Sequence, residues 1–187
     1  MALTGSRTFV GFGFGAIQAG LFLYEAYQSD AFGRLVVAEV VPEMVTTLRS
    51  AGGMFGVNIA HADHIERAQV GPVTLENPAD PADRERLIAA IAEADEIATA
   101  VPSIAYYAGD SPGSLHRILA AGLRRKAAEG GVRCVVYTAE NNNHAAESLQ
   151  AQVMAEIPGR KPGRRDAARR THQHRLEIGA ALPQPGG

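Results

Sequence analysis

The chain has 187 residues, of which 46% are hydrophobic, and this is sufficient for one domain with a buried core, alone or followed by a tail. Its single cysteine, Cys134, excludes a disulfide within the chain and fits a reducing cytoplasm, and no uninterrupted apolar run is typical of a membrane span. The net charge of −2 hides a split, because residues 1–157 carry 18 acidic and 11 basic side chains whereas residues 158–187 carry 2 acidic and 7 basic ones. We therefore expect a cytoplasmic protein with a folded domain over 1–157 and a separate basic segment over 158–187.

The first predicted elements are a strand over residues 8–12, a turn with glycines at alternate positions, and a helix with apolar residues at Ile17, Leu21 and Tyr24. Glycines suit such a turn because it needs unusual backbone angles and because a diphosphate must approach the backbone closely. The first N–H groups of the helix and its dipole then attract the negative charge.

Two registers of a dinucleotide-binding fingerprint fit this turn: residues 11–16, and residues 13–20 with Gln18 at the third glycine position. We prefer the second register, because residues 8–12 then form a complete strand. In this register Gly20 is expected to provide the close contact between helix and sheet. The glycine motif alone is weak evidence.

A secretory signal peptide is an alternative interpretation of the same stretch, because Arg7 precedes a mostly apolar run over residues 8–23. Glu25 and Asp30 lie where its cleavage region would be, which argues against it. The segment that follows is moreover the strand that a nucleotide-binding fold requires next.

That next strand covers residues 35–40, and its continuous apolar character is typical of a parallel strand covered on both faces. Glu39 lies near its end, at about the spacing from the glycine turn at which an acidic residue binds the adenosine ribose. A carboxylate there would repel the 2′-phosphate of NADP by about 1 to 4 kcal/mol at about 4 Å, so NAD is the predicted cofactor. The structural alternative for Glu39 is a solvated carboxylate at a strand end.

The rest of the chain alternates between helical and strand patterns. The predicted elements are a helix over 42–51 ended by Gly52 and Gly53, short strands or a hairpin within 56–76, a helix capped by Asp80 or Asp83, a strand over 96–101, a helix from Ser111 or Pro112 to Gly130, a strand over 133–138 and a helix ending near Ile157. This alternation predicts an α/β protein with a Rossmann-like, doubly wound parallel sheet. In such sheets ligands bind at the carboxyl ends of the strands, where the glycine turn, Glu39, Val101 and Glu140 should meet.

Four segments together resemble the N-terminal domain of the mannitol dehydrogenase and mannitol-1-phosphate 5-dehydrogenase family, the polyol-specific long-chain NAD-dependent dehydrogenases. The segments are GFGAIQAGLF at 13–22, VAEV at 37–40, TAV at 99–101 and AENN at 139–142. The resemblance covers about residues 8–157. Gln18 departs from the glycine often found at its position.

The resemblance implies that the glycine turn cradles the diphosphate, that Glu39 holds the adenosine ribose, and that Val101 and Asn141 face the nicotinamide half. The predicted NAD-binding residues are Gly13, Phe14, Gly15, Ala16, Ile17, Glu39, Val101, Glu140 and Asn141. Without the resemblance, residues 140–143 would also fit a polar turn with an asparagine helix cap.

No catalytic residue is predicted in this chain. In the family a second, mostly helical domain supplies the substrate pocket and a catalytic lysine with nearby Asn and His, whereas this chain has only Lys126 and Lys161, neither in such an arrangement. We therefore expect a truncated dehydrogenase, cut or shifted out of frame near residue 157, with NAD(H) as partner and a polyol or polyol phosphate only if a substrate domain is supplied. The alternative is a non-catalytic dinucleotide-binding or interaction module whose basic tail binds a partner.

Two other groups of residues suggest weaker sites. The tail over 158–187 combines seven basic residues with four prolines and five glycines, which predicts a disordered segment. A nucleic-acid-binding arm is less favoured, because no aromatic side chains lie between the arginines. His61, Asp63 and His64 have no further ligand at metal-site spacing, so we expect a surface turn and no metal.

Overall fold

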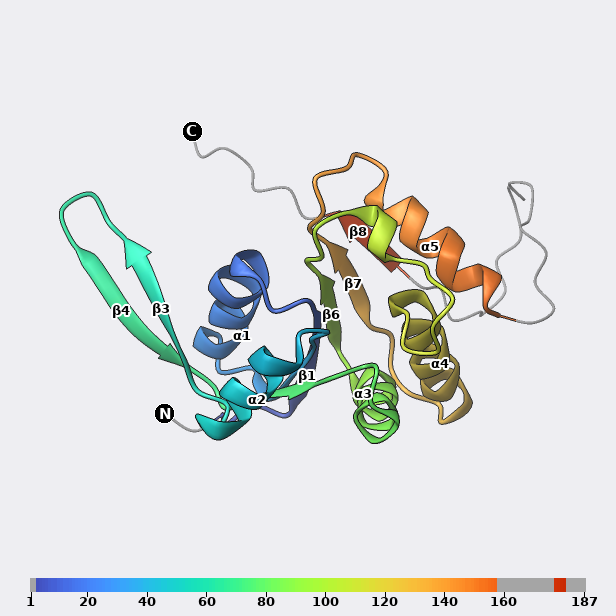
Figure 1. The fold of residues 1–187 in the computed structure, drawn as a ribbon, viewed down its shortest axis with the longest axis horizontal. Coiled ribbons are helices and arrows are strands. Elements are labelled where there is room, and N and C mark those ends of the chain that lie inside the picture. The colour runs from blue at the N-terminus through green and yellow to red at the C-terminus, as the bar shows by residue number, and fades with distance from the viewer. Residues whose placement is uncertain (1–2, 158–176, 181–187) are drawn as a thin grey trace.

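The computed structural model describes residues 3–157 and 177–180, and its main feature is a six-stranded sheet in which every paired neighbour is parallel (Figure 1). The strands lie in the order β5-β2-β1-β6-β7-β8. Their bounds are β1 Arg7–Phe12, β2 Phe32–Ala38, β5 Val73–Glu76, β6 Glu96–Thr99, β7 Val135–Thr138 and β8 Glu177–Ala180. This is the strand order of a doubly wound Rossmann sheet, so the predicted fold class is confirmed. The order reverses between β1 and β6, where such sheets bind their ligands.

Helices cover both faces of the sheet (Figure 1). Their bounds are a π-helical segment η1 Gln18–Leu23 that continues into α1 Tyr24–Gln28, then α2 Pro42–Ser50, α3 Pro81–Glu93, a short 3₁₀ helix η2 Ile104–Tyr106, α4 Leu115–Ala128 and α5 Ala145–Ala155. Helices α1 and α2 pack on one face, and α3, α4 and α5 pack on the other.

Each central strand contributes to two hydrophobic cores. On β2, Val36 packs into the core beneath α3 and α4, whereas Leu35 and Val37 pack into the core beneath α1 and α2. Successive side chains of a strand point to opposite faces, so a strand buried on both faces is apolar at nearly every position. This requirement explains the continuous apolar run that predicted the strand.

Several helix ends form as their residues predict. Asp80 is the N-cap of α3, and its carboxylate accepts hydrogen bonds from the backbone N–H groups of Ala82 and Asp83. Gly52 and Gly53, with φ of 64° and 77°, follow the last turn of α2 in the left-handed conformation that favours glycine.

The predicted hairpin is an antiparallel ribbon that stands apart from the main sheet (Figure 1). It consists of β3 Phe55–Ala60 and β4 Ile65–Val70. Residues 73–76, which were also expected to be a short strand, instead join the edge of the main sheet beside β2.

Beyond residue 157 the structure describes only β8, which pairs with β7 from Val135↔Glu177 to Thr138↔Ala180. The predicted tail contains this strand, and the remainder of the segment predicted to be disordered lies outside the described residues. Within the described part of the chain, no helix has the length and apolar character needed to cross a membrane.

Candidate functional site

The glycine turn lies at the carboxyl end of β1. Gly13 has φ of 84°, and its N–H group donates a 2.9 Å hydrogen bond to the carbonyl of Ala38 at the end of β2. A Cβ at Gly13 would lie 2.9 Å from the carbonyl oxygen of Ala100, so both the backbone angle and the space require glycine. Gly15 differs, because a Cβ there would meet nothing within 4 Å. The turn is therefore packed against the sheet at Gly13 and open at Gly15, as close approach by a diphosphate requires.

The close contact between helix and strand is made by Gly11, not by Gly20. A Cβ at Gly20 would meet nothing within 4 Å, so the predicted role of Gly20 is wrong. A Cβ at Gly11 would lie 2.5 Å from Nε2 of Gln18, whose side chain is completely buried. The helix carries a large side chain where other fingerprints have glycine, and the strand accommodates it by having no side chain at Gly11.

Glu39 links the glycine turn to the end of β2. Its carboxylate accepts hydrogen bonds from the backbone N–H groups of Phe14 (2.7 Å) and Val41 (2.8 Å), and the residue is only 6% exposed. A carboxylate offers about four lone-pair positions, so two remain after these bonds. Glu39 can therefore hold the turn and still accept hydrogen bonds from ribose hydroxyls.

Glu140 lies two residues after β7, and its contacts are with protein groups. Oε1 accepts a 3.0 Å hydrogen bond from the N–H group of Val101, and Oε2 accepts hydrogen bonds from the hydroxyls of Thr99 (2.9 Å) and Tyr107. Burial, reinforced by the hydrogen bond to Glu140, raises the pKa of Tyr107 well above its ordinary value, so this hydroxyl stays a donor. Asn141, the next residue, is exposed.

The nine predicted residues thus come from the carboxyl ends of four neighbouring strands. Gly13 contacts the end of β6 near Ala100 and Val101, and Phe14 is bonded to Glu39 at the end of β2. Gly15, Ala16 and Ile17 are exposed beside them, and Glu140 joins the ends of β6 and β7.

Contacts between segments far apart in the chain also shape this edge. The ring of Phe14 packs edge-on against Phe55 of β3 with centroids 5.1 Å apart, so the hairpin touches the glycine turn. The hydroxyl of Tyr107 donates a hydrogen bond to Glu140 and so anchors the loop after β6. Cross-strand contacts of this kind have no local sequence pattern, because the partners are dozens of residues apart.

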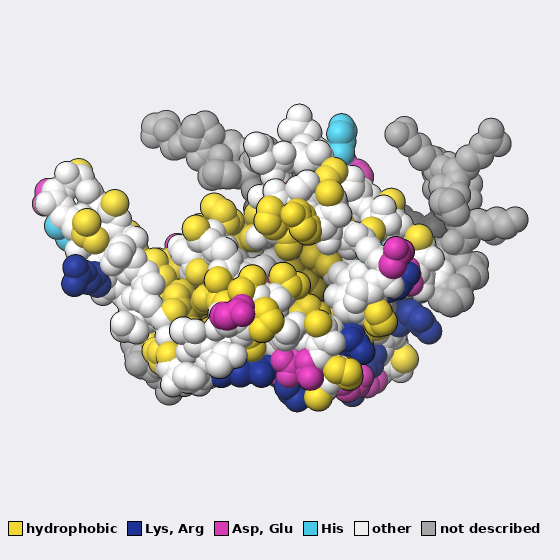
Figure 2. Space-filling model, in the orientation of Figure 1, with side chains coloured by type: hydrophobic (Ala, Val, Ile, Leu, Met, Phe, Trp, Pro, Cys, Tyr) yellow, Lys and Arg dark blue, Asp and Glu magenta, His cyan; other side chains and the backbone are white. Residues whose placement is uncertain are grey.

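The turn is surrounded by exposed apolar side chains. Ile17 is 52% exposed and Val40 is 72% exposed, and Leu21, Val41 and Met44 are also exposed. Figure 2 shows hydrophobic side chains gathered over the middle of this face, between the β3–β4 hairpin and α5. Such a gathered apolar surface is typical of a place where a ligand or another protein part packs.

Other candidate groups lie elsewhere. Lys126 is buried at the opposite edge of the sheet, where its ammonium group donates to the carbonyls of Ala92 (3.1 Å) in the last turn of α3 and Ala94 (2.7 Å) just after it. His61 and His64 lie at the exposed tip of the hairpin, paired with Glu66 and Asp63. Within residues 3–157 and 177–180, no group of three or more His, Cys, Asp or Glu side chains could hold a metal ion.

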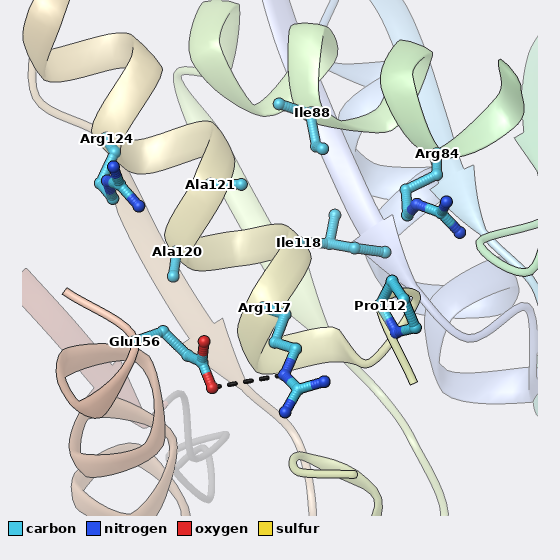
Figure 3. Close-up of a pocket in the computed structure, with 9 residues that line it drawn as sticks. All are labelled: Arg84, Ile88, Pro112, Arg117, Ile118, Ala120, Ala121, Arg124 and Glu156. Carbon is cyan, nitrogen blue, oxygen red and sulfur yellow. Dashed lines mark hydrogen bonds and ion pairs between the residues drawn. The ribbon is translucent and has the colours of Figure 1, made fainter. Parts of the chain in front are cut away.

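A pocket of about 350 Å³ lies on the outer surface of α3 and α4 (Figure 3). Arg84, Arg117 and Arg124 line it, together with Glu156, which is 3.4 Å from Nε of Arg117. None of the nine predicted NAD-binding residues lines this pocket.

Comparison with known proteins places the fold. No family model matches the chain, and no curated protein matches its sequence. Among solved structures, mannitol 2-dehydrogenase from Pseudomonas fluorescens, in a ternary complex with NAD and D-mannitol, matches with a TM-score of 0.66 and 16% identity over 83% of this chain and 38% of that one. D-sorbitol dehydrogenase in its substrate-free form matches with a TM-score of 0.65 and 14% identity over 83% of this chain and 39% of that one.

Identities this low establish a shared fold and no more. The chain therefore has a doubly wound α/β fold that also occurs in two polyol dehydrogenases, and it spans about two fifths of the length of each. Both neighbours are of the broad class that the sequence resemblance predicts.

Proposed function

We propose that this chain is the NAD-binding domain of a polyol or polyol-phosphate dehydrogenase, which transfers hydride between NAD and a sugar alcohol. The observation that carries the proposal is the bond between Glu39 and the N–H group of Phe14 beside an open glycine turn. This bond brings the ribose-binding carboxylate and the diphosphate-binding turn together at the switch point of the sheet. The fold shared with a mannitol 2-dehydrogenase solved with NAD supports the same assignment.

The residues of the turn would divide the cofactor between them. Gly15, Ala16 and Ile17 would present backbone N–H groups to the diphosphate, and the open space at Gly15 gives it room. Glu39 would accept hydrogen bonds from the ribose, and Val101 and Asn141 would lie toward the nicotinamide half. When bound, NAD supplies the ring that accepts or returns the hydride.

The charge of Glu39 favours NAD over NADP. Among the described residues, no Lys or Arg forms an ion pair with Glu39, so a 2′-phosphate near it would meet an uncompensated carboxylate. Two charges about 4 Å apart near a protein surface repel by about 1 to 4 kcal/mol, which corresponds to about 5-fold or more in affinity.

Proton transfer to or from the substrate would be supplied outside residues 3–157. Lys126 is committed to two backbone carbonyls at the far edge of the sheet, so it does not act at this site. The family resemblance implies a helical domain carrying a catalytic lysine, and the exposed apolar residues around the turn give such a domain a surface on which to pack.

The position of Lys126 also favours a second candidate, a dinucleotide-binding module that does no chemistry. The two candidates differ in one measurement. Hydride transfer between NAD and a sugar alcohol, catalysed by the purified chain or by the chain mixed with a separately made helical domain, supports the dehydrogenase. Tight NADH binding with no transfer in either mixture supports the module.

Calorimetric titration of the full chain with NADH and NADPH tests cofactor binding, with Glu39→Ala as the variant. We expect saturable NADH binding that exceeds NADPH binding at least 5-fold and that weakens about 10-fold or more in the variant, because a bond to a charged group contributes about 1.5 to 3 kcal/mol. Glu43→Gln, which removes an exposed carboxylate of α2 next to the same loop, is the matched control and should bind as the wild type does. Equal binding of NADH by the wild type and a folded Glu39→Ala variant would contradict the proposal.

A further inference from the structure

The loop that follows β6 is held by one carboxylate, from the segment that follows the neighbouring strand β7. Residues 100–114 connect β6 to α4 and begin at the switch point of the sheet. Glu140, from the segment after β7, accepts hydrogen bonds from Thr99 at the end of β6, from the backbone of Val101 in the loop, and from Tyr107 after η2. Three points spread over nine positions of the chain are thus joined to a single side chain.

Tyr107 extends this connection to the next helix. Its side chain is buried and donates to Glu140, while its carbonyl oxygen accepts a 3.0 Å hydrogen bond from the N–H group of His116 in the first turn of α4. The loop is therefore held at its start by Val101 and at its far part by Tyr107, and Glu140 is the residue common to both. Removing this carboxylate would release both points at once.

Glu140 has its hydrogen-bonding capacity directed into the protein. It is 8% exposed, and protein donors take three of the about four lone-pair positions of its carboxylate, one on Oε1 and two on Oε2, whereas they take two on Glu39. We propose that Glu140 is a positioning residue that fixes the backbone at Val101, and with it the place of the nicotinamide half of NAD, without touching the cofactor. This inference rests on the proposed function, because it concerns the same cofactor.

A carboxylate suits this position better than an amide. All three partners are donors, so the side chain must only accept. In a Glu140→Gln variant, one carboxylate oxygen is replaced by an NH₂ group, which cannot accept from Val101 or from the two hydroxyls. At least one buried donor then loses its partner, and the loop can leave its place while the side-chain volume is nearly unchanged.

The test compares two ligands that differ in the nicotinamide ring. NADH and ADP-ribose share the adenosine and diphosphate parts, so a residue that acts only on the nicotinamide half affects NADH alone. We expect wild-type chain to bind NADH more tightly than ADP-ribose, and Glu140→Gln to weaken NADH about 10-fold while changing ADP-ribose less than 2-fold. Glu147→Gln, an exposed carboxylate on α5, is the control and should change neither.

A second measurement needs no ligand. Amide hydrogen exchange at Val101 should accelerate about 10-fold or more in Glu140→Gln, while exchange at Phe14, whose N–H group is bonded to Glu39, stays within 2-fold of wild type. Glu140→Asp, which keeps the charge but shortens the side chain, should show the same selective loss and serves if the Gln variant does not fold.

Several outcomes would overturn the inference. Equal weakening of both ligands would show that Glu140 only stabilises the fold, and unchanged binding of both would show that the loop does not depend on it. Equal affinity of the wild type for NADH and ADP-ribose would show that the nicotinamide ring adds no binding contact. That result would contradict this inference and leave the adenosine site of the proposed function standing. A wild-type chain that binds neither ligand would overturn the proposed function itself, and the inference would fall with it.

Discussion

Two glutamates at the same edge of the sheet use the same chemistry with different results. Glu39, at the end of β2, accepts two backbone N–H bonds, one of them from the glycine turn. Glu140, after β7, accepts one backbone N–H bond and two hydroxyl bonds, all from the β6 side. Both are nearly buried, and the turn beside Glu39 is open at Gly15.

The difference shows that position alone does not decide how much of a carboxylate's hydrogen-bonding capacity the protein itself uses. Both side chains lie at carboxyl ends of parallel strands, where ligands bind in such sheets. What separates them is the number of donors that their own chain supplies, two at Glu39 and three at Glu140, because each donor occupies one of the about four lone-pair positions of a carboxylate.

The largest expected effect tests the turn that lies between the two glutamates. Gly13→Ala should lower the free energy of unfolding by about 2 to 4 kcal/mol, because a non-glycine residue costs about 1 to 2 kcal/mol at a left-handed backbone angle and its Cβ would also crowd the carbonyl of Ala100. Urea unfolding followed by circular dichroism measures the change. Gly20→Ala is the control, and we expect it to be neutral or stabilising by about 0.5 to 1 kcal/mol, because it fills open space on a helix. A Gly20→Ala variant as unstable as Gly13→Ala would restore the role first predicted for Gly20.

The next prediction compares the two carboxylates directly. Glu140→Gln should destabilise the fold by about 2 to 3 kcal/mol and Glu39→Gln by about 1 to 2 kcal/mol, because the first leaves more deeply buried donors without a partner. The order of the two midpoints in urea unfolding is the measurement. If Glu39→Gln is the less stable variant, the difference drawn between the two sites is wrong.

The turn is closely packed on its strand side, where the side chain of Gln18 lies against Gly11, and open at Gly15. Gly11→Ala should cost about 1 to 3 kcal/mol, because its Cβ would overlap the buried amide of Gln18. In a Gln18→Ala background the same change should cost less than about 1 kcal/mol, because the overlapping atoms are gone. A double-mutant cycle by urea unfolding measures the coupling, and additive effects of the two changes would contradict the contact.

The smallest expected effect concerns a third carboxylate, that of Asp83 in α3, which accepts a hydrogen bond from the N–H group of Asn77 just after β5. Asp83 is buried, which alone would raise its pKa, but the N–H group of Asn77 and the guanidinium groups of Arg49 and Arg86 together lower the pKa below its ordinary value. A pKa lower in the folded state contributes stability above about pH 4, where Asp83 is ionised in both states, and this contribution is lost as pH falls through the folded-state pKa.

Urea midpoints measured from pH 7 to pH 2.5 should therefore fall more steeply in the wild type than in Asp83→Asn, which has no carboxyl group to protonate. Equal slopes would show that Asp83 is not the group involved.

The sequence predicted the sheet because its signals are local. Continuous apolar runs identify parallel strands, and glycines and Asp80 identify turns and caps within a few residues of themselves. It also placed Glu39 correctly at the end of β2. Local patterns could not show that Gly11 accommodates Gln18, because the two residues meet only after the helix folds back on the strand.

Strand β8 and the roles of Thr99 and Tyr107 were missed for a related reason. Residues 177–180 lie in a segment whose composition predicts disorder, yet they pair with β7, and pairing partners leave no mark within a short segment. Tyr107 meets Glu140 across 33 positions of the chain. Contacts made across the sheet depend on topology, which a one-dimensional pattern does not contain.

The β3–β4 hairpin has two ends that lie next to each other. The N–H group of Val73 donates to the carbonyl of Gly53, and a Cβ at Gly71 would lie 2.4 Å from that same carbonyl, so the chain leaves and re-enters the domain at nearly one point. The hairpin is thus an insertion between these two points, and its last residue, Val70, is buried in the core beneath α1 and α2. Since Phe55 at its base touches Phe14, a change in the length or sequence of the hairpin would reach the glycine turn through this ring contact.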